Sequence, residues 1–218
     1  MTEAGVNLWD TAAHALEYLS RQDSIPHRTE GEAALLESLP MAVSRVLDLG
    51  SGDGRLLSLV RLARPGGRAV ALDFSETMLE RLRARFAADT SVTIVAHDLS
   101  QPLPYSLGTF DAVVSCFAIH HVTHARKRAL YDEVYARLNP GGAFCNLEHV
   151  ASPTGALHAQ FLRALDTDPS EEDPSNKLLD VETQLGWLRG IGFADVDCHW
   201  KWRELALLAG VRPALTVR

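Results

Sequence analysis

Residues 46–54 read VLDLGSGDG and residues 70–73 read VALD. A short apolar run breaks into three alternate glycines, and a second apolar run ends in an acid. This order predicts a strand, a glycine turn, a helix and a second strand of a parallel sheet, with the Asp73 carboxylate placed to accept from two ribose hydroxyls. The stretch therefore predicts an α/β fold with a nucleoside-sized site at the ends of its strands.

The spacing of the glycines bears on which nucleoside is bound. A dinucleotide fingerprint needs its third glycine at position 55, but that residue is Arg55 and the third glycine is Gly54. Asp53, at the start of the following helix, would repel a pyrophosphate, although it suits the positive end of the helix dipole. The turn is therefore typical of a ligand without phosphate at that point, which disfavours an NAD-linked dehydrogenase.

Composition limits the class of protein. The chain has 218 residues, of which 46% are hydrophobic and 22% are charged, so we expect one globular domain over residues 1–218. The net charge of −7 disfavours nucleic acid as a partner, because a phosphate backbone attracts a basic face. No apolar run approaches the ~18 residues of a membrane span, and we expect no secretory signal. The three cysteines stand singly, without the Cys-x-x-Cys spacing of a redox or metal motif. These features predict a cytoplasmic protein with no membrane contact, and they leave its oligomeric state open.

Short apolar strands alternate with helices in the middle of the chain. We expect strands near 45–49, 68–72, 91–96, 110–115 and 142–149, and helices near 53–63, 75–87 and 123–138. Such alternation predicts right-handed crossovers and a parallel sheet, with ligands beyond the carboxyl ends of its strands.

Helices are also expected on both sides of this core. A helical period over residues 8–20 and the spacing of a capping box, Thr29 to Glu32, predict two N-terminal helices. The C-terminal part predicts a helix over 152–165, an acidic loop or lid over 166–176, a helix over 181–188 ended by Gly190, and a strand over 193–200. The period of residues 205–211 fits either a helix or a strand.

Five motifs in order make residues 44–149 resemble the class I S-adenosylmethionine-dependent methyltransferases. The matching segments are VLDLGSGDG at 46–54, LDFSETML at 72–79, HDL at 97–99, FDAVVSCFAIHH at 110–121 and RLNPGG at 137–142. The resemblance implies a doubly wound, mostly parallel seven-stranded sheet with helices on both faces, an antiparallel last strand at 205–211 and an N-terminal helical lid. It divides the single domain into a lid at 1–40, a cofactor-binding core at 44–149 and an acceptor-side segment at 150–218.

The resemblance also implies S-adenosyl-L-methionine as the cofactor, with binding residues at the motifs. Gly50 and Gly52 would let the backbone approach the aminoacyl part, and Asp48 would order the turn or meet the ammonium group. Asp73 would accept from the ribose, with a helix cap as the alternative role. The other cofactor-binding candidates are Phe74 and Met78 beside the adenine, Asp98 and Leu99 at its edge, and Cys116 near the methyl group. Packing in the core is the alternative for Met78 and Cys116, and a turn is the alternative for Asp98.

Histidines follow the fourth and fifth strands, so their side chains are aimed at the same rim. We predict that His121 and His149, beside Glu148, orient the acceptor and remove its proton, because imidazole accepts protons near neutral pH. A purely structural role is the alternative. A metal site built from His120, His124 and Glu148 is disfavoured, because the spacing fixes no third ligand, and we expect no metal.

Two residues of the N-terminal segment are candidates for the acceptor side. As part of a lid, Tyr18 and Arg28 would contact the acceptor or a carboxylate, and a surface position is the alternative. The sequence as a whole predicts methyl transfer to a small-molecule acceptor, at oxygen, nitrogen or carbon, by in-line displacement. Two alternatives stay open: a methylase or related group transferase acting on a modified tRNA base, and a protein that binds S-adenosylmethionine without catalysis.

Overall fold

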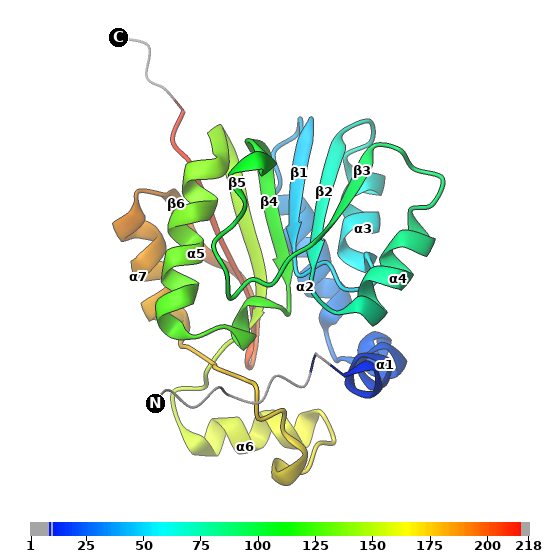
Figure 1. The fold of residues 1–218 in the computed structure, drawn as a ribbon. Coiled ribbons are helices and arrows are strands. Elements are labelled where there is room, and N and C mark those ends of the chain that lie inside the picture. The colour runs from blue at the N-terminus through cyan, green and yellow to red at the C-terminus, as the bar shows by residue number, and fades with distance from the viewer. Residues whose placement is uncertain (1–8, 10, 215–218) are drawn as a thin grey trace.

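A seven-stranded sheet forms the centre of the molecule (Figure 1). The computed structural model describes residue 9 and residues 11–214. The strands are β1 (Arg45–Leu49), β2 (Arg68–Asp73), β3 (Val92–Ala96), β4 (Phe110–Cys116), β5 (Leu138–His149), β6 (Ala194–Trp202) and β7 (Leu205–Val211), in the order β3-β2-β1-β4-β5-β7-β6. Neighbours among β1 to β5 are parallel, whereas β7 is antiparallel to both β5 and β6. The predicted sheet with its antiparallel last strand is confirmed.

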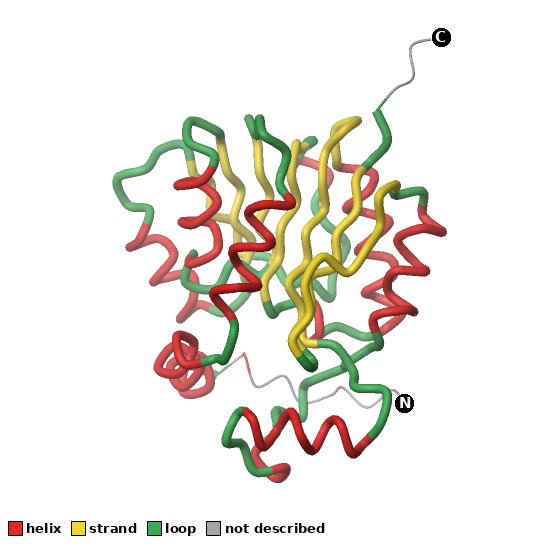
Figure 2. Tube along the Cα trace, turned by 180° about the vertical axis from the view of Figure 1, so that it is seen from behind, coloured by secondary structure: helices red, strands yellow, loops and turns green. Residues whose placement is uncertain are grey.

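Helices cover both faces of this sheet, because its strands carry apolar side chains on both sides. In β1, Val46, Leu47 and Leu49 are all buried, as in a strand covered on each face. Side chains of α5 (His124–Arg137) and α7 (Val181–Ile191) join the core on one face. Those of α2 (Arg28–Ser38), α3 (Arg55–Ala63) and α4 (Glu76–Arg85) join the core on the other face, which is turned toward the viewer in Figure 2. The doubly wound arrangement is therefore present.

The N-terminal segment divides into two parts. Helix α1 (Ala12–Arg21) and the 3-10 turn η2 (Gln22–Ser24) lie at one end of the sheet, whereas α2 packs against the strands (Figure 1). The approach of α2 is close at Gly31, where a Cβ atom would lie 2.9 Å from both Leu147 and Trp200. Of the helix predicted over 8–20, residues 8 and 10 lie outside the described residues.

The capping box expected at the start of α2 is wrong. The helix begins at Arg28 after His27, whose backbone is left-handed (φ 59°), and none of the described side chains caps this end. Glu32 is instead turned into the interior, where it is 2% exposed and pairs with Arg28 and Arg55. The spacing from Thr29 to Glu32 thus belongs to a buried ion-pair network.

The C-terminal segment carries α6 (Gly155–Ala164), the 3-10 turn η5 (Pro169–Glu171), α7 and the β6–β7 hairpin. Figure 1 places α6 at the same end of the sheet as α1. The expected helix end at Gly190 is wrong, because α7 continues to Ile191 and Gly192, with φ 118°, supplies the left-handed cap. Residues 205–211, ambiguous by period, form a buried strand. No helix among the described residues is both long and apolar enough to cross a membrane.

Two further boundaries differ from the expectation. Helix α3 begins at Arg55 and not near 53, because Gly54 before it has a left-handed backbone (φ 85°). Strand β5 begins at Leu138 and not near 142, with a register shift against β4. The remaining 3-10 turns are η3 (Tyr105–Leu107) and η4 (Ile119–His121). Both corrections leave the strand ends, and therefore the site, in place.

Candidate active site

A cavity of ≈ 520 Å³, the larger cavity, lies at the carboxyl ends of β1, β2 and β4. Every residue predicted to bind the cofactor contributes to its wall: Asp48, Gly50, Gly52, Asp73, Phe74, Met78, Asp98, Leu99 and Cys116. Tyr18 and Arg28 of the N-terminal segment and His121 of η4 complete the set of predicted residues around it. The parallel topology thus brings together motifs that are far apart in the sequence.

The first glycine turn is shaped by close contact on one side and open space on the other. Gly50 and Gly52 both have left-handed backbones, with φ of 66° and 55°. A Cβ atom at Gly50 would lie 2.3 Å from the Cβ of Ala118, whereas one at Gly52 would meet nothing within 4 Å. Gly50 therefore permits the turn to pack against the segment after β4, and Gly52 leaves its backbone open to the larger cavity.

Asp73 ends β2, and the backbone of two turns holds its side chain. Its Oδ2 accepts from the Gly52 N–H at 2.8 Å and its Oδ1 accepts from the Ser75 N–H at 2.9 Å. Burial raises the pKa of this carboxyl, against the hydrogen bonds, which lower it. Each oxygen retains a further lone pair. The carboxylate is thus oriented to accept from two neighbouring hydroxyls of a ligand.

Asp48 differs from Asp73 because its carboxylate has no partner. The residue is 1% exposed, and neither oxygen is hydrogen-bonded to any described residue. Burial, with the nearby charge of Asp73, raises the pKa of Asp48 to about 7. A buried carboxylate without a partner is costly to charge, so a cationic group in the larger cavity is strongly favoured beside it.

The adenine candidates occupy mixed environments. Met78 is 1% exposed and belongs mainly to the core, although it reaches the cavity wall, and Phe74 is half-buried there. Asp98 accepts from both the backbone N–H (2.8 Å) and the hydroxyl (2.5 Å) of Ser100, which is the turn anticipated as its alternative role. These bonds still leave carboxylate lone pairs at the edge of the cavity.

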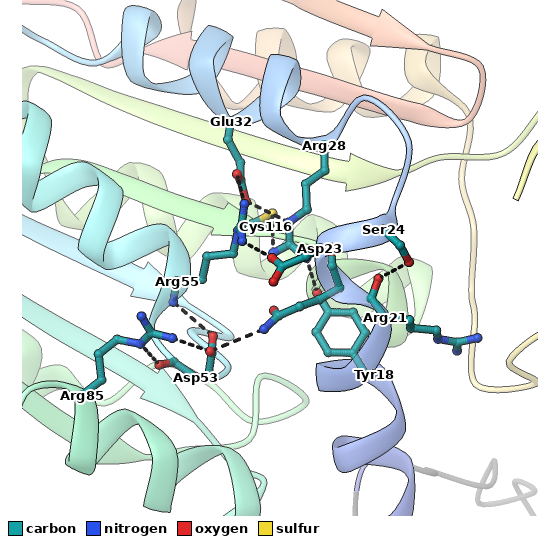
Figure 3. Close-up of polar contacts among 11 residues, drawn as sticks. Tyr18, Arg21, Asp23, Ser24, Arg28, Glu32, Asp53, Arg55, Arg85 and Cys116 are labelled. Carbon is teal, nitrogen blue, oxygen red and sulfur yellow. Dashed lines mark hydrogen bonds and ion pairs between the residues drawn. The ribbon is translucent and has the colours of Figure 1, made fainter.

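Arg28 lies in a buried polar network beside the larger cavity (Figure 3). Arg28 is 5% exposed, and its guanidinium donates to Glu32 at 2.8 Å and to the Tyr18 hydroxyl at 3.0 Å. Its Nη2 lies 4.0 Å from the Cys116 sulfur, and burial raises the pKa of that thiol to about 12. Cys116 is therefore a neutral thiol. Arg28 is no surface residue, and its less engaged edge suits a carboxylate ligand.

The sequence did not predict the ion pairs that connect the N-terminal segment to the start of α3, just after the glycine turn at residues 50–54. Glu32 bridges Arg28 and Arg55, and Asp23 of η2 also pairs with Arg55. Asp53, in the same turn, accepts from Arg85 at 2.5 Å (Figure 3). Gln22 of η2 also donates to Asp53, at 3.5 Å. The one available signal was Arg55 itself, the residue that departs from the dinucleotide pattern, because it is the cation that binds the N-terminal segment.

A second cavity of ≈ 210 Å³, the smaller cavity, adjoins the larger one. Four residues line both: Trp9, Tyr18, Phe117 and His121. The other wall combines apolar side chains of α6 with histidines and acids, among them Phe161, Leu162, His120, His149, Glu172 and Asp173. The acidic segment over 166–176 thus forms a wall of this cavity.

The two predicted catalytic histidines have different partners. His121 Nδ1 lies 2.9 Å from the Ser175 hydroxyl, and its Nε2 is buried without a hydrogen-bond partner among the described residues. Burial, followed by the charge of His120, lowers the pKa of His121 well below its ordinary value. His149, in contrast, has its Nε2 bonded to Glu204 at 3.0 Å. His121 therefore lines both cavities and carries a buried Nε2 without a hydrogen-bond partner among the described residues.

The disfavoured metal arrangement is not assembled. His120 Nδ1 is bonded to Glu148 at 2.6 Å, and His124 Nε2 is bonded to the Leu178 carbonyl at 3.1 Å. Within residue 9 and residues 11–214, no group of three or more His, Cys, Asp or Glu side chains is arranged to hold a metal ion.

Comparison with known proteins agrees with this geometry. Residues 46–142 match a family described as a methyltransferase domain. A demethylmenaquinone methyltransferase from Clavibacter sepedonicus is 34% identical over 192 residues, which cover 80% of this chain and 76% of that protein. The chain belongs to the class I S-adenosylmethionine-dependent methyltransferases. A carboxy-S-adenosyl-L-methionine synthase from Klebsiella pneumoniae is 26% identical over 87% of this chain and 86% of its own.

Solved structures share the fold of this methyltransferase. An O-methyltransferase family protein from Burkholderia thailandensis has a TM-score of 0.72 at 19% identity, over 95% of this chain and 62% of its own. The N-methyltransferase NodS from Bradyrhizobium japonicum, in complex with S-adenosyl-L-homocysteine, has a TM-score of 0.67 at 17% identity, over 94% of this chain and 99% of its own.

S-adenosylmethionine is thus the cofactor of this methyltransferase, and the larger cavity has the chemistry to hold it. The unpartnered carboxylate of Asp48 suits an ammonium group, the carboxylate of Asp73 suits a ribose diol, and the backbone at Gly52 is open to close approach.

Proposed function

We propose that this methyltransferase methylates a small-molecule acceptor that binds in the smaller cavity, at an oxygen, nitrogen or carbon atom. The cavity adjoins the larger one and is bounded by the segments expected on the acceptor side, namely α1, α6 and residues 166–176. Its volume of ≈ 210 Å³ is below the range of about 300–1,000 Å³ for drug-sized sites. We therefore expect a compact acceptor, or the compact reacting part of a longer one.

His121 is the proposed base, and one observation carries this assignment. Its Nε2 is buried and without a partner among the described residues, although His121 lines both cavities. A neutral imidazole in this position accepts the proton that the acceptor loses as it is methylated. His149, which is bonded to Glu204, is proposed to contact the acceptor as part of the cavity wall.

The residues of the larger cavity are proposed to orient the cofactor. Asp73 accepts from the ribose hydroxyls, Asp48 meets the ammonium, and Arg28 binds the carboxylate. When bound, the cofactor supplies a methyl group on a positively charged sulfur, which the acceptor atom displaces in line. Because the reactivity lies in the cofactor, the protein acts chiefly by alignment and by exclusion of water.

Acceptor methylation tests the proposal directly. The full chain is incubated with S-adenosylmethionine and compact phenols, hydroquinones and amines, beginning with a demethylmenaquinone analogue because of the Clavibacter relative. The methylated product and S-adenosylhomocysteine are then measured by mass spectrometry. His121→Gln should lower kcat by about 10²-fold or more, and His199→Gln, at an exposed position on β6, should not. Full activity of His121→Gln would remove the base assignment.

Cofactor binding is tested separately by calorimetric titration with S-adenosylhomocysteine. The affinity of Asp73→Ala should fall at least tenfold, or about 1.4 kcal/mol, while NAD should not bind to the wild type. Unchanged affinity in Asp73→Ala would show that the ribose is held elsewhere.

A second candidate is the transfer of a group derived from S-adenosylmethionine, as in the modification of a tRNA base. Two observations favour it: the similarity to the carboxy-S-adenosyl-L-methionine synthase over most of the chain, and the buried guanidinium of Arg28 near Cys116. Titration with carboxy-S-adenosylmethionine distinguishes the candidates. Binding that is tighter than that of S-adenosylmethionine and is lost in Arg28→Gln would favour the second candidate.

A further inference from the structure

The loop from residue 173 to residue 177 lies between the two cavities. Ser175 and Lys177 line the larger cavity, whereas Asp173 lines the smaller one. Two contacts of Lys177 hold the loop against η4: its N–H donates to the His120 carbonyl at 2.8 Å, and its Nζ donates to the His121 carbonyl at 2.9 Å. The loop is therefore fixed beside the histidine that faces both cavities.

Ser175 contacts Asp173 through its backbone and His121 through its hydroxyl. Ser175 is 2% exposed, and its Oγ lies 2.9 Å from His121 Nδ1. The Asp173 carboxylate accepts from the Ser175 backbone N–H at 2.8 Å, and the neighbouring Ser175 hydroxyl helps to lower the pKa of Asp173. Its other oxygen lies 3.4 Å from Nε2 of His14 in α1. These contacts thus connect α1 and the loop to η4.

The protons available to Asp173, Ser175 and His121 decide which of them donates and which accepts in each contact. Burial raises the pKa of Asp173, but the hydrogen bonds from Ser175 and the nearby His121 and His14 lower it, so that the carboxylate is charged and only accepts. The Asp173 carboxylate attracts the one proton of the Ser175 hydroxyl, which would leave the hydroxyl oxygen to accept from His121 Nδ1–H, 2.9 Å away. The lone pair of a neutral imidazole then lies on Nε2, the atom without a partner among the described residues.

We propose that Ser175 and Asp173 are positioning residues that hold His121 in the Nδ1–H tautomer, with the lone pair on the unpartnered Nε2. The inference rests on the proposed function, because it explains how His121 is prepared to act as a base. The acceptor loses its proton to Nε2 as it gains the methyl group, and the positive charge of the sulfonium is replaced by that of an imidazolium. Asp173, linked through the Ser175 hydroxyl, lies close to that developing charge.

Charged and titratable groups from several elements face His121. They are His120 on the same turn, Asp173 and Lys177 on the loop, Glu148 on β5 and Lys127 on α5, with His14 of α1 contacting Asp173. Burial and then His120 lower the pKa of His121, whereas Asp173 and Glu148 raise it. Removing the charge of Asp173 should therefore lower the pKa of His121 further.

Nitrogen-15 NMR of the full chain reads the tautomer without any need for turnover. The ring signals of His121 are assigned by their loss in His121→Gln. At pH 7.5 the wild type should show a protonated Nδ1 and an unprotonated Nε2, Ser175→Ala should show a mixture, and Ser175→Thr should restore the wild-type pattern. A protonated Nε2 in the wild type, or an unchanged pattern in Ser175→Ala, would overturn the inference whatever the activity.

Kinetics test the part of Asp173. In Asp173→Asn the acid limb of the pH profile of kcat/KM should move to lower pH. A general base contributes ~10²–10⁴-fold to kcat, and we expect this variant to lower kcat by about tenfold. The KM for S-adenosylmethionine should change little. Asp168→Asn is the matched control, because Asp168 lies in the same acidic segment and caps η5. An acid limb that stays in place in Asp173→Asn rejects the role of Asp173. If His121→Gln retains full activity, the proposed base fails, and the NMR result still decides the tautomer.

Discussion

The larger and smaller cavities adjoin, but they are built from different kinds of contact. In the larger cavity, strand ends meet through the backbone: the Gly52 N–H donates to Asp73, a residue 21 positions away. In the smaller cavity, side chains meet side chains across long separations. His149, which lines this cavity, bonds Glu204 from 55 positions away, and His158, which is outside the cavity wall, bonds the same carboxylate from 46 positions away.

Under the proposed function, this difference would separate recognition of the cofactor from recognition of the acceptor. Backbone donors are provided by any residues that form the same turn, so the larger cavity depends mainly on glycine positions and two strand-end acids. Each side-chain pair of the smaller cavity depends on two particular residues. We infer that single substitutions reshape the acceptor site while leaving cofactor binding intact.

The largest effect is expected in the side-chain network that holds α2 beside the larger cavity. Glu32→Gln removes the carboxylate that bridges Arg28 and Arg55 (Figure 3). Breaking a buried ion pair costs about 3–5 kcal/mol, so the free energy of unfolding in urea should fall by that amount. Glu37→Gln, at an exposed position of the same helix, is the control. A loss no larger than that of the control would show that the network contributes little.

The next largest effect is expected at the glycine turn in the wall of the larger cavity, where the backbone sets the geometry. Gly50→Ala places a Cβ atom 2.3 Å from Ala118 in a left-handed conformation, whereas Gly66→Ala is left-handed (φ 87°) with nothing within 4 Å. Left-handed backbone alone costs about 1–2 kcal/mol, and the collision adds about 1–3 kcal/mol at position 50. Thermal unfolding and titration with S-adenosylhomocysteine should show Gly50→Ala to be the weaker protein in both. Equal behaviour of the two variants would mean that the turn relaxes freely.

The same contrast explains what the sequence predicted. The strand-end motifs placed Asp48, Asp73 and the glycines on one cavity because the partners are close in sequence and parallel topology fixes where strand ends meet. The bond between His121 and Ser175, 54 positions apart, was not predictable, because no period or turn rule relates the two residues.

Glu32 is a residue whose role could not be predicted from local spacing. Its distance from Thr29 fits a helix cap, and the same residue also fits a buried partner for two arginines. Local spacing does not distinguish the two, because burial is decided by the packing of α2 on the sheet. The acidic segment over 166–176 is a similar case, since only its contacts with α1 and η4 make it a cavity wall.

A smaller effect concerns Asp48, the strand-end acid without a partner. Because its pKa is raised to about 7, the carboxylate becomes protonated below that pH and loses its attraction for an ammonium group. The affinity for S-adenosylhomocysteine should therefore fall as pH is lowered from 7 to 5.5, by up to about tenfold per unit. In Asp48→Asn the affinity should be lower at pH 7 and nearly independent of pH over this range. A wild-type affinity that does not change with pH would place the ammonium elsewhere.

The smallest effect tests the charged pairs beside the smaller cavity, where His158 bonds both Glu172, which lines the cavity, and Glu204. Burial lowers the pKa of His158, but the hydrogen bond and charge of Glu204, followed by those of Glu172, raise it above 6.5 overall. A raised histidine pKa stabilises the fold fully below 6.5, and this contribution is lost as pH rises through the folded-state value.

Between pH 6 and pH 8.5 the wild type should therefore lose stability relative to His158→Gln, by less than about 1 kcal/mol because the pair is partly exposed. Glu204 does not contribute to the change in stability between pH 6 and pH 8.5. Its pKa is lowered, so its contribution to stability is lost only on acidification below 4.5. His199→Gln, at an exposed position, should keep the wild-type slope in urea unfolding. If His158→Gln keeps that slope as well, α6 is held by Phe161 and Leu162 in the core, and the smaller cavity is a packed site whose charged pairs contribute orientation and little stability.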